Sequence, residues 1–531
     1  MFCVVVCLNA SSGAMRYPDF VMKRHAAALV LAPLAVAACR PSEAQKGAPA
    51  PTGATAPPVA AVPAASASPA VSPAPPPASE RAAPAPSVGP LRFIALGGGP
   101  TPESTEVSLE QDIDLVRRAL PAPGLVLFAG GSESPIVREL DPSAKGDPVR
   151  LALGDLFSPR IGRQSRYRAP SFGAERATLE NVEARLSAAL SEGEGSLLVY
   201  VAAHGDRGSD AKSNSVALWG GRSLSVSALA ELHERHRRPL RLVATSCFSG
   251  GFGELAFANA DARTRRPAPV PRCGLFAGTA DRETSGCDPN PNRRAQESYG
   301  LHLVHALAGT RRDGKPLEPG LADFDHDGKI GVLDAHTFAR IESVSFDVPT
   351  TTSERWLREV ETSSAPIDRA ASPEDSAVID RLGALLGLKS EPAVNARWAA
   401  LDRQLAALES SIEQAEEELA DRAADEATRL LERWPVLDDP FHPDFEATFR
   451  DNRAVIEQLL TGSPEARERE RADQRAHALY DELDAVSVQE ARVLRLSRAY
   501  ETLHKASALE KRGGPAAKAY AALVACERAV P

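Results

Sequence analysis

Two short apolar runs lead into a histidine and a cysteine, which together could carry out nucleophilic chemistry at a thiol. Residues 196–203 lead into His204-Gly205, and residues 240–246 lead into Cys247. Short apolar runs bounded by glycine-rich turns are typical of buried strands in a parallel sheet. Reactive side chains of such sheets lie just beyond the carboxyl ends of neighbouring strands. We therefore expect an imidazole and a thiol to lie side by side at one edge of the sheet, where the imidazole activates the thiol as a nucleophile.

The pair resembles the catalytic motifs of the clan CD cysteine peptidases, which include caspases, metacaspases, legumain-like and gingipain-like enzymes. In that group an apolar block ends in His-Gly and a later one ends in Cys, and the spacing found here fits. Residues 245–250 read TSCFSG and depart from the Gln-Ala-Cys-x-Gly signature of caspases, which argues against caspase-type specificity. The resemblance implies that Cys247 attacks a peptide carbonyl and that His204 protonates the departing amine. It also implies an oxyanion hole made by the backbone N–H groups of Gly205 and Cys247.

Strands and helices alternate around the two motifs. The apolar spacing predicts strands at 91–96, 124–129, 196–203, 240–246 and 274–278, and helices at 108–120, 177–190, 226–237 and 299–308. Residues 216–221 predict a short hairpin, and residues 140–175, which have no clear period, predict an insertion loop. This alternation is typical of an α/β sandwich with a mostly parallel sheet. The resemblance implies that the sandwich is a caspase-like peptidase domain over residues 91–350.

Acidic residues near the two motifs are candidates for the substrate pocket. Asp206, Asp281 and Glu283 lie in loops that follow the expected strands, and their charge would favour a basic side chain at the cleavage site. Solvated surface charge is the alternative interpretation.

Three further cysteines lie outside the proposed dyad and the N-terminal leader. Cys273 and Cys287 flank the fifth expected strand and are candidates for a disulfide in an oxidising compartment. Two separate thiols are the alternative. Cys526 lies in a terminal amphipathic helix, where we expect a small buried apolar residue.

Residues 323–334 match the calcium-binding loop of an EF-hand. Carboxylates alternate along the loop, and Gly328 permits its sharp turn. The expected ligands are Asp323, Asp325, Asp327, the backbone oxygen of Lys329, and Asp334. Because Asp334 stands where Glu is usual and reaches less far, we expect weak binding of Ca²⁺ in a modulating role, and no cofactor that is required. An acidic turn before a helix is the alternative.

The N-terminal residues resemble a bacterial lipoprotein signal. Residues 23–25 are basic, residues 26–38 form a short apolar core, and Cys39 follows a lipobox-like Val-Ala-Ala. We expect residues 1–39 to be this signal with Cys39 as the lipidated residue; an ordinary secretory signal is the alternative. Residues 40–90 are almost entirely Ala, Pro, Ser and Gly, which predicts a disordered linker. This organisation predicts a lipid-anchored protein of the bacterial cell envelope that faces the periplasm or the exterior.

The C-terminal region, residues 373–531, is predicted to be helical. Heptad stripes run through Leu401, Leu405, Leu408, Ile412, Ala415 and Leu419, and through Leu479, Leu483, Val486, Val493 and Tyr500. Helices packing within the chain are the plain interpretation, and a module for partner binding or self-association is the alternative. The formal net charge of -10 argues against nucleic-acid binding through a broad basic surface.

These observations favour a lipid-anchored cysteine endopeptidase that acts on protein or peptide substrates through His204 and Cys247. One alternative is a catalytically silent caspase-like scaffold that acts through protein–protein interactions. Another is a calcium-binding adhesion or structural lipoprotein. Catalysis separates the first from the other two, and calcium-dependent binding without turnover would favour the last.

Overall fold

The computed structural model describes residues 90–141, 143, 146–157 and 165–531, which lie within one compact unit. The expected signal, the lipidated Cys39 and all of the expected linker except Pro90 lie outside the described residues. Among the described residues, no helix is long and apolar enough to cross a membrane.

A six-stranded sheet forms the centre, with the strand order β11-β10-β9-β5-β1-β2. Its strands are β1 (Phe93–Gly98), β2 (Gly124–Phe128), β5 (Leu197–Ala203), β9 (Leu240–Ala244), β10 (Arg272–Phe276) and β11 (Thr350–Thr351). The first five pair in parallel, and β11 pairs antiparallel with β10. The predicted α/β class with a mostly parallel sheet is therefore confirmed.

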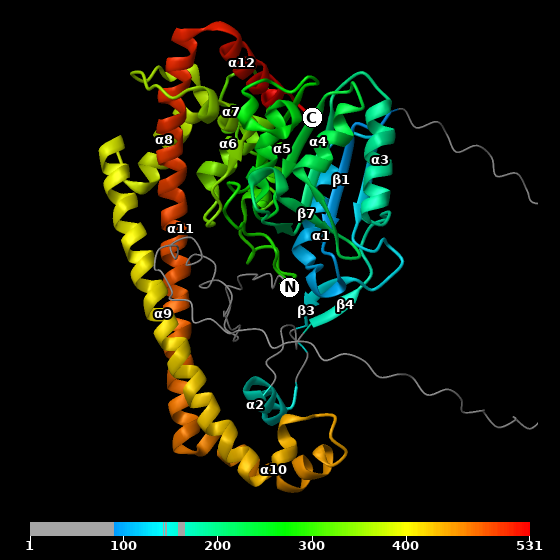
Figure 1. Ribbon diagram of the computed structural model, residues 1–531, viewed down its shortest axis with the longest axis vertical. Helices are drawn as coiled ribbons and strands as arrows, with labels where there is room; N and C mark the ends of the chain where they lie inside the picture. The colour runs from blue at the N-terminus through cyan, green and yellow to red at the C-terminus, as the bar shows by residue number, and fades with distance from the viewer. Residues whose placement is uncertain (1–89, 142, 144–145, 158–164) are drawn as a thin grey trace, which may run out of the picture. The chain divides into compact units, whose positions relative to one another are not determined.

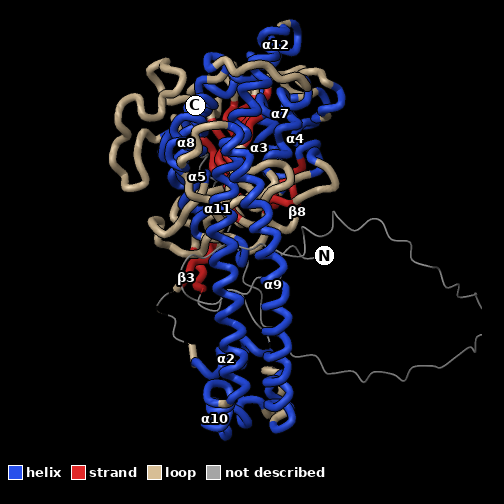
Figure 2. Tube along the Cα trace, turned by 90° about the vertical axis from the view of Figure 1, so that its left-hand side faces the viewer, coloured by secondary structure: helices blue, strands red, loops and turns tan. Residues whose placement is uncertain are grey.

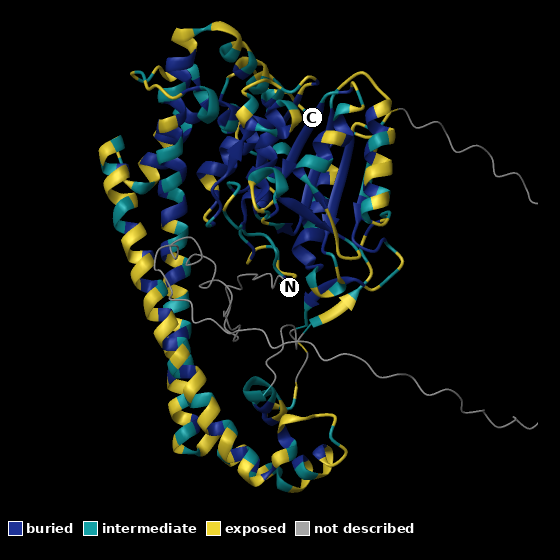
Figure 3. Ribbon diagram, in the orientation of Figure 1, coloured by how far each residue is buried: buried dark blue, intermediate teal, exposed yellow. Residues whose placement is uncertain are grey.

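Helices cover both faces of the sheet (Figure 1). The helices that follow the strands are α1 (Val107–Ala119), α3 (Leu179–Ser191), α4 (Val226–Glu234), α5 (Tyr299–Leu307) and α6 (Val332–Glu342). Alternate residues of a strand face opposite sides: Phe93 and Ala95 of β1 pack with α1 and α5, whereas Ile94 and Leu96 pack with α3 and α4. Because both faces of the sheet are covered, most strand residues are buried (Figure 3), and the strand sequences are mostly apolar.

Shorter elements connect these layers. An antiparallel hairpin pairs β3 (Val137–Leu140) with β4 (Ser165–Arg168), and a three-stranded antiparallel sheet contains β6 (Gly205–Asp206), β7 (Ser215–Leu218) and β8 (Arg222–Ser225). The 3-10 turns are η3 (Pro102–Ser104), η4 (Ala211–Ser213), η5 (Ser249–Ala256), η6 (Ala258–Ala260), η7 (Ala262–Thr264), η8 (Arg369–Ala371) and η9 (Pro435–Asp438). The β7–β8 pair confirms the hairpin expected at 216–221.

The region expected to be an insertion loop contains regular structure, so that prediction is wrong in part. Helix α2 spans Pro148–Phe157, and β4 also lies in this region. Val149 and Leu153 of α2 pack with Phe445, Phe449 and other apolar residues of the helical region. This contact is distant in sequence, so local periodicity does not reveal it.

The C-terminal region is helical, as predicted. Its helices are α7 (Thr352–Val360), α8 (Pro373–Leu386), α9 (Glu391–Arg433), α10 (Phe445–Gly462), α11 (Pro464–Arg512) and α12 (Gly514–Arg528). The two long helices α9 and α11 run side by side, with α10 between them in the chain (Figures 1 and 2). The stripe predicted from Leu401 to Leu419 is buried, and in the second stripe every residue except the partly buried Leu479 is buried. The stripes therefore form a seam within the chain.

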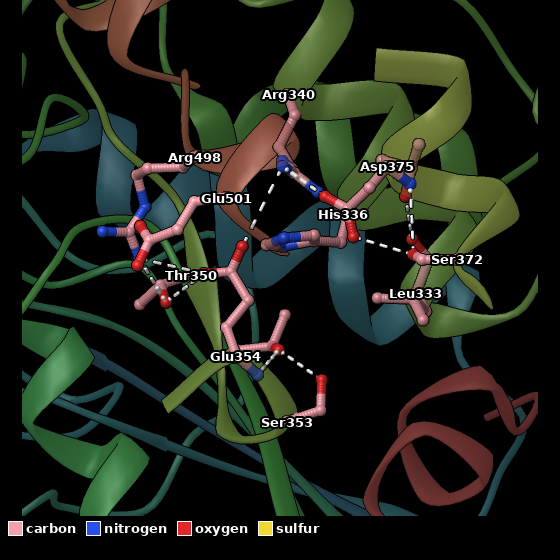
Figure 4. Close-up of polar contacts among 12 residues, drawn as sticks. Leu333, His336, Arg340, Thr350, Ser353, Glu354, Ser372, Asp375, Arg498 and Glu501 are labelled. Carbon is pink, nitrogen blue, oxygen red and sulfur yellow. Dashed lines mark hydrogen bonds and ion pairs between the residues drawn. The ribbon is translucent and has the colours of Figure 1, made fainter. Parts of the chain in front are cut away.

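Buried charges join α6, α7, α8 and α11 (Figure 4). Arg498 donates to the Glu354 carboxylate at 2.9 Å, and Arg340 donates to Asp375 at 2.9 Å. Ser372 donates to the second oxygen of Asp375 at 2.7 Å. Buried charges are costly unless they are paired, so these contacts fix the helical region against the elements that follow the sheet.

The disulfide expected between Cys273 and Cys287 is wrong. Cys273 pairs with Cys526, with a Cα–Cα distance of 6.2 Å, which is an ordinary separation for a disulfide. Helix α12 brings Cys526 back to strand β10, whereas Cys287 lies in the loop beyond that strand. The expectation that Cys526 is only an apolar core residue is wrong for the same reason.

Candidate thiol–imidazole site

Strands β5 and β9 bring the two sequence motifs together. They pair in parallel, with Val201 opposite Ala244, so His204 and Cys247 both follow at one sheet edge. The backbones also touch there, because a Cβ added to Gly205 would lie 2.1 Å from the carbonyl oxygen of Cys247. Only glycine permits this approach. The juxtaposition expected from sequence is present at the level of the backbone.

A left-handed turn follows the Cys247 position. Phe248 has φ 58°, and its N–H donates to the carbonyl oxygen of Arg282 at 2.8 Å. The 3-10 turn η5 begins at the next residue, Ser249. A non-glycine residue at positive φ is costly, and such strained residues cluster at active sites and ligand clamps. This turn fixes Cys247 between the end of β9 and the start of η5.

The Cys247 thiol is covered by Thr284. The Thr284 N–H donates to Cys247 Sγ at 3.3 Å, and Sγ lies 3.7 Å from the Thr284 carbonyl oxygen. Burial raises the pKa of Cys247 to about 12, with a further contribution from the charge of Cys287. In this arrangement the Cys247 side chain is a protonated thiol.

His204 has different partners on its two nitrogens. Nε2 lies 2.8 Å from the carbonyl oxygen of Ser104 and 3.0 Å from Oε2 of Glu106. Both partners accept hydrogen bonds, so Nε2 carries a proton. On the other side, Nδ1 lies 3.4 Å from Sγ of Cys287. The nitrogen that exchanges a proton with a thiol is therefore Nδ1.

Glu106 is a site residue that the sequence reasoning missed. It is the N-cap of α1, is 2% exposed, and accepts from Arg138 Nη2 at 2.8 Å. Burial opposes its charge, but attraction to His204 and Arg138 lowers the pKa of Glu106. The signal in the sequence was that Glu106 follows the β1 run, which predicts the same sheet edge as His204; that β1 lies beside β5 is known only from the structure.

The surroundings of His204 favour its charged form. Burial opposes protonation, but Cys287 and Glu106 together raise the pKa of His204 well above its ordinary value. An imidazole that keeps its proton is a general acid, and it can also neutralise a thiolate.

Cys287 lies beside His204 instead of in a disulfide. One oxygen of Glu106, one ring nitrogen of His204 and Sγ of Cys287 all lie within 4.8 Å of one another. Sequence reasoning missed this role because Cys287 sits on the loop after β10, where no strand register fixes its position.

The three acidic pocket candidates lie in segments that follow strands of the site. Asp206 directly follows Gly205 in β6. Asp281 accepts a hydrogen bond from Thr279 at 2.6 Å, and Glu283 raises the pKa of Cys247 through its charge. Their role in substrate recognition stays a prediction.

Part of the expected calcium loop is assembled. Carboxylate oxygens of Asp323, Asp325 and Asp327 lie within 4.8 Å of one another. Asp334 points its oxygens at the loop backbone: Oδ1 accepts from the Phe324 N–H at 2.8 Å and Oδ2 accepts from the Gly331 N–H at 2.9 Å.

These contacts leave Asp334 outside the three-carboxylate group within the described part of the chain. Burial raises its pKa to about 6. Arg528 Nε also lies 3.6 Å from Oδ2 of Asp325. Calcium binding, including the backbone oxygen of Lys329, stays a prediction.

No protein-family model matches the chain, and no curated protein matches it.

Proposed function

We propose that this protein is a cysteine endopeptidase on a caspase-like fold, with His204 and Cys247 as its catalytic pair. The observation that carries the proposal is the convergence of three neighbouring strands: β1, β5 and β9 lead to Glu106, His204 and Cys247 at one sheet edge. A base oriented by a carboxylate beside a thiol is the arrangement that nucleophilic catalysis requires.

The proposed reaction is acyl transfer to sulfur. When the Cys287 segment moves away, His204 loses the larger of the two charges that raise its pKa. The neutral imidazole then takes the proton of Cys247 at Nδ1, the thiolate attacks the peptide carbonyl, and the imidazolium returns the proton to the departing amine. Water then hydrolyses the thioester. Glu106 and the Ser104 carbonyl hold the Nε2–H and leave Nδ1 for a thiol; in the structure the thiol beside Nδ1 is that of Cys287. The N–H groups of Gly205 and Cys247 stabilise the oxyanion.

Substrate binding must move the segment that contains Thr284 and Cys287. In the structure Thr284 covers Cys247, and Cys287 occupies the position next to Nδ1 of His204. The arrangement is that of a resting enzyme whose thiol is uncharged. Displacement of this segment exposes the Cys247 thiol and lets it meet the imidazole.

Several further properties belong to the same proposal. Asp206, Asp281 and Glu283 support a preference for a basic side chain at the cleavage site. The Cys273–Cys526 disulfide supports an oxidising compartment, in line with a lipid-anchored envelope protein. Calcium bound at the three-carboxylate loop would modulate the enzyme.

A peptide library varied at the position before the scissile bond tests the proposal. Wild type, Cys247→Ala, His204→Ala and Cys287→Ala are compared, each with calcium and with chelator. We expect cleavage by wild type and Cys287→Ala and none by Cys247→Ala or His204→Ala. Cleavage that survives in Cys247→Ala but is lost in Cys287→Ala would move the nucleophile to Cys287.

A catalytically silent scaffold is the second candidate, and the raised pKa of the partly buried Cys247 thiol favours it. A thiol with a pKa of about 12 is a poor nucleophile. Folded wild-type protein that cleaves no peptide in any condition would support the scaffold.

A further inference from the structure

The Glu106–His204–Cys287 cluster has the composition of a transition-metal site. Its three residues offer a carboxylate oxygen, an imidazole nitrogen and a thiol sulfur, and these atoms lie within 4.8 Å of one another. Glu106 and His204 are each 2% exposed. Zinc binds this mixture of ligands, and zinc sites with three protein ligands keep a fourth position for water.

The spacing of the ligand atoms is close to that of a bound ion. Zinc lies about 2.0–2.3 Å from each ligand, so tetrahedral ligand atoms are about 3.3–3.8 Å apart. Oε2 of Glu106 lies 3.0 Å from Nε2 of His204, and Sγ of Cys287 lies 3.4 Å from Nδ1. These are different nitrogens of one ring, and a single ion binds only one of them. Binding of all three residues to one ion therefore requires His204 to turn until a single ring nitrogen faces both Glu106 and Cys287, whose ligand atoms lie within 4.8 Å of one another.

The residues come from three separate parts of the fold, which holds the cluster in place. Glu106 starts α1, His204 follows β5, and Cys287 lies in the loop beyond β10. Arg138 holds the second oxygen of Glu106 at 2.8 Å. On the loop that carries Cys287, Ser285 donates to Asp347 through both its N–H and its hydroxyl.

We propose that Glu106, His204 and Cys287 form a binding site for Zn²⁺. Bound zinc takes a ring nitrogen of His204 and so withdraws the imidazole from Cys247. Zinc is then an inhibitor that holds the Cys287 segment in its resting position. The binding step is independent of the proposed peptidase activity, whereas the inhibition rests on it.

Cobalt substitution tests the binding step without any substrate. Metal-free protein is titrated with Co²⁺ under anaerobic conditions, and Zn²⁺ is then added as a competitor. We expect a thiolate-to-cobalt charge-transfer band at one ion per chain, and its loss when Zn²⁺ displaces Co²⁺. Cys287→Ala should lack the band, and Glu106→Gln should weaken affinity by at least about tenfold.

Two control variants separate this site from other groups on the chain. Cys247→Ala and Asp325→Asn each remove a metal-binding side chain that lies outside the cluster, and both should keep the band. Near-ultraviolet circular dichroism checks that each variant is folded. A band that persists in folded Cys287→Ala, or that disappears in Cys247→Ala, would overturn the proposal.

Alkylation of the wild-type protein gives a test that does not depend on variants. Iodoacetamide is added with Zn²⁺, with Ca²⁺ or with chelator, and modification of Cys287 is measured by peptide mass spectrometry. We expect protection of Cys287 by Zn²⁺ alone, because Ca²⁺ prefers oxygen ligands. Equal labelling in all three conditions would refute zinc binding. Protection by Zn²⁺ in protein that cleaves no peptide would sustain the metal site while the proposed function fails.

Discussion

Removing the Cys273–Cys526 disulfide should lower the free energy of unfolding by several kcal/mol. The bridge closes a segment with a sequence separation of 253 residues. In the chain-entropy treatment, a loop of this length restricts the unfolded chain by about 18–19 cal/mol/K, which is about 5.5 kcal/mol at 25 °C. Measured losses for native disulfides are about 2–5 kcal/mol, so we expect Cys526→Ala to fall in that range.

Non-covalent contacts also hold α12 in the folded protein. Glu527 accepts hydrogen bonds from Thr352 and Ser353, and Arg241 donates to the carbonyl oxygens of Ala529 and Val530. These contacts remain in the variant, so the C-terminal helix still docks in the native state. The effect is therefore carried by the unfolded chain.

Urea unfolding of oxidised wild type and Cys526→Ala measures the difference, and Cys287→Ala is the matched control. Peptide mapping of the oxidised wild type identifies the bridge directly. The reasoning fails if wild type and Cys526→Ala unfold at the same urea concentration, or if mapping finds Cys273 joined to Cys287. Cys287→Ala should change the free energy of unfolding by less than about 1 kcal/mol, because it breaks no bridge.

Three further predictions concern Glu106, Glu490 and Glu527. Cys287 and Glu106 both raise the pKa of His204, and Glu106→Gln removes the second of these charges, so kcat should fall by up to roughly 10²-fold and the basic limb of the pH–rate profile should move to lower pH. Glu490→Gln removes the carboxylate that holds Arg282 at 2.6 Å. Because a hydrogen bond to a charged group contributes about 1.5–3 kcal/mol, tryptic cleavage after Arg282 should rise about tenfold or more. Burial raises the pKa of Glu527 to about 7 from an ordinary 4.5, so its carboxyl stabilises the fold below pH 4.5 and loses this contribution as pH rises through 7. Relative to Glu527→Gln, wild type should lose up to about 3 kcal/mol between pH 4.5 and 8 in urea unfolding.

Each of these three predictions has a clear contrary outcome. An unchanged pH–rate profile in Glu106→Gln would mean that Glu106 does not set the charge of His204. Glu482 is exposed on α11, and Glu482→Gln is the control for Glu490→Gln. Equal trypsin sensitivity of the two variants would show that Glu490 does not hold the Arg282 loop. Parallel stability curves for wild type and Glu527→Gln would show that Glu527 has an ordinary pKa.

Local sequence determined the elements that carry the central chemistry. In the strands before His204 and Cys247, β5 and β9, every residue is buried, and every residue except Arg241 is apolar. Consecutive apolar residues with glycine turns indicate a parallel sheet, and a parallel sheet places successive strand ends at one edge. These two facts place His204 and Cys247 at the same edge of the sheet, and the pairing of β5 with β9 makes them neighbours there. The heptad stripe of α9 follows in the same way from the 3.5-residue period.

Tertiary structure decided the partners of these residues. Strand order placed Glu106 beside His204, and the return of α12 to β10 joined Cys273 to Cys526 and left Cys287 beside the imidazole. These contacts join residues that are far apart in the chain and lie on loops or helix ends, where no periodic pattern records which surface they meet. A strand or helix is encoded by its own neighbours in sequence, whereas a site is encoded by the packing of whole elements against one another.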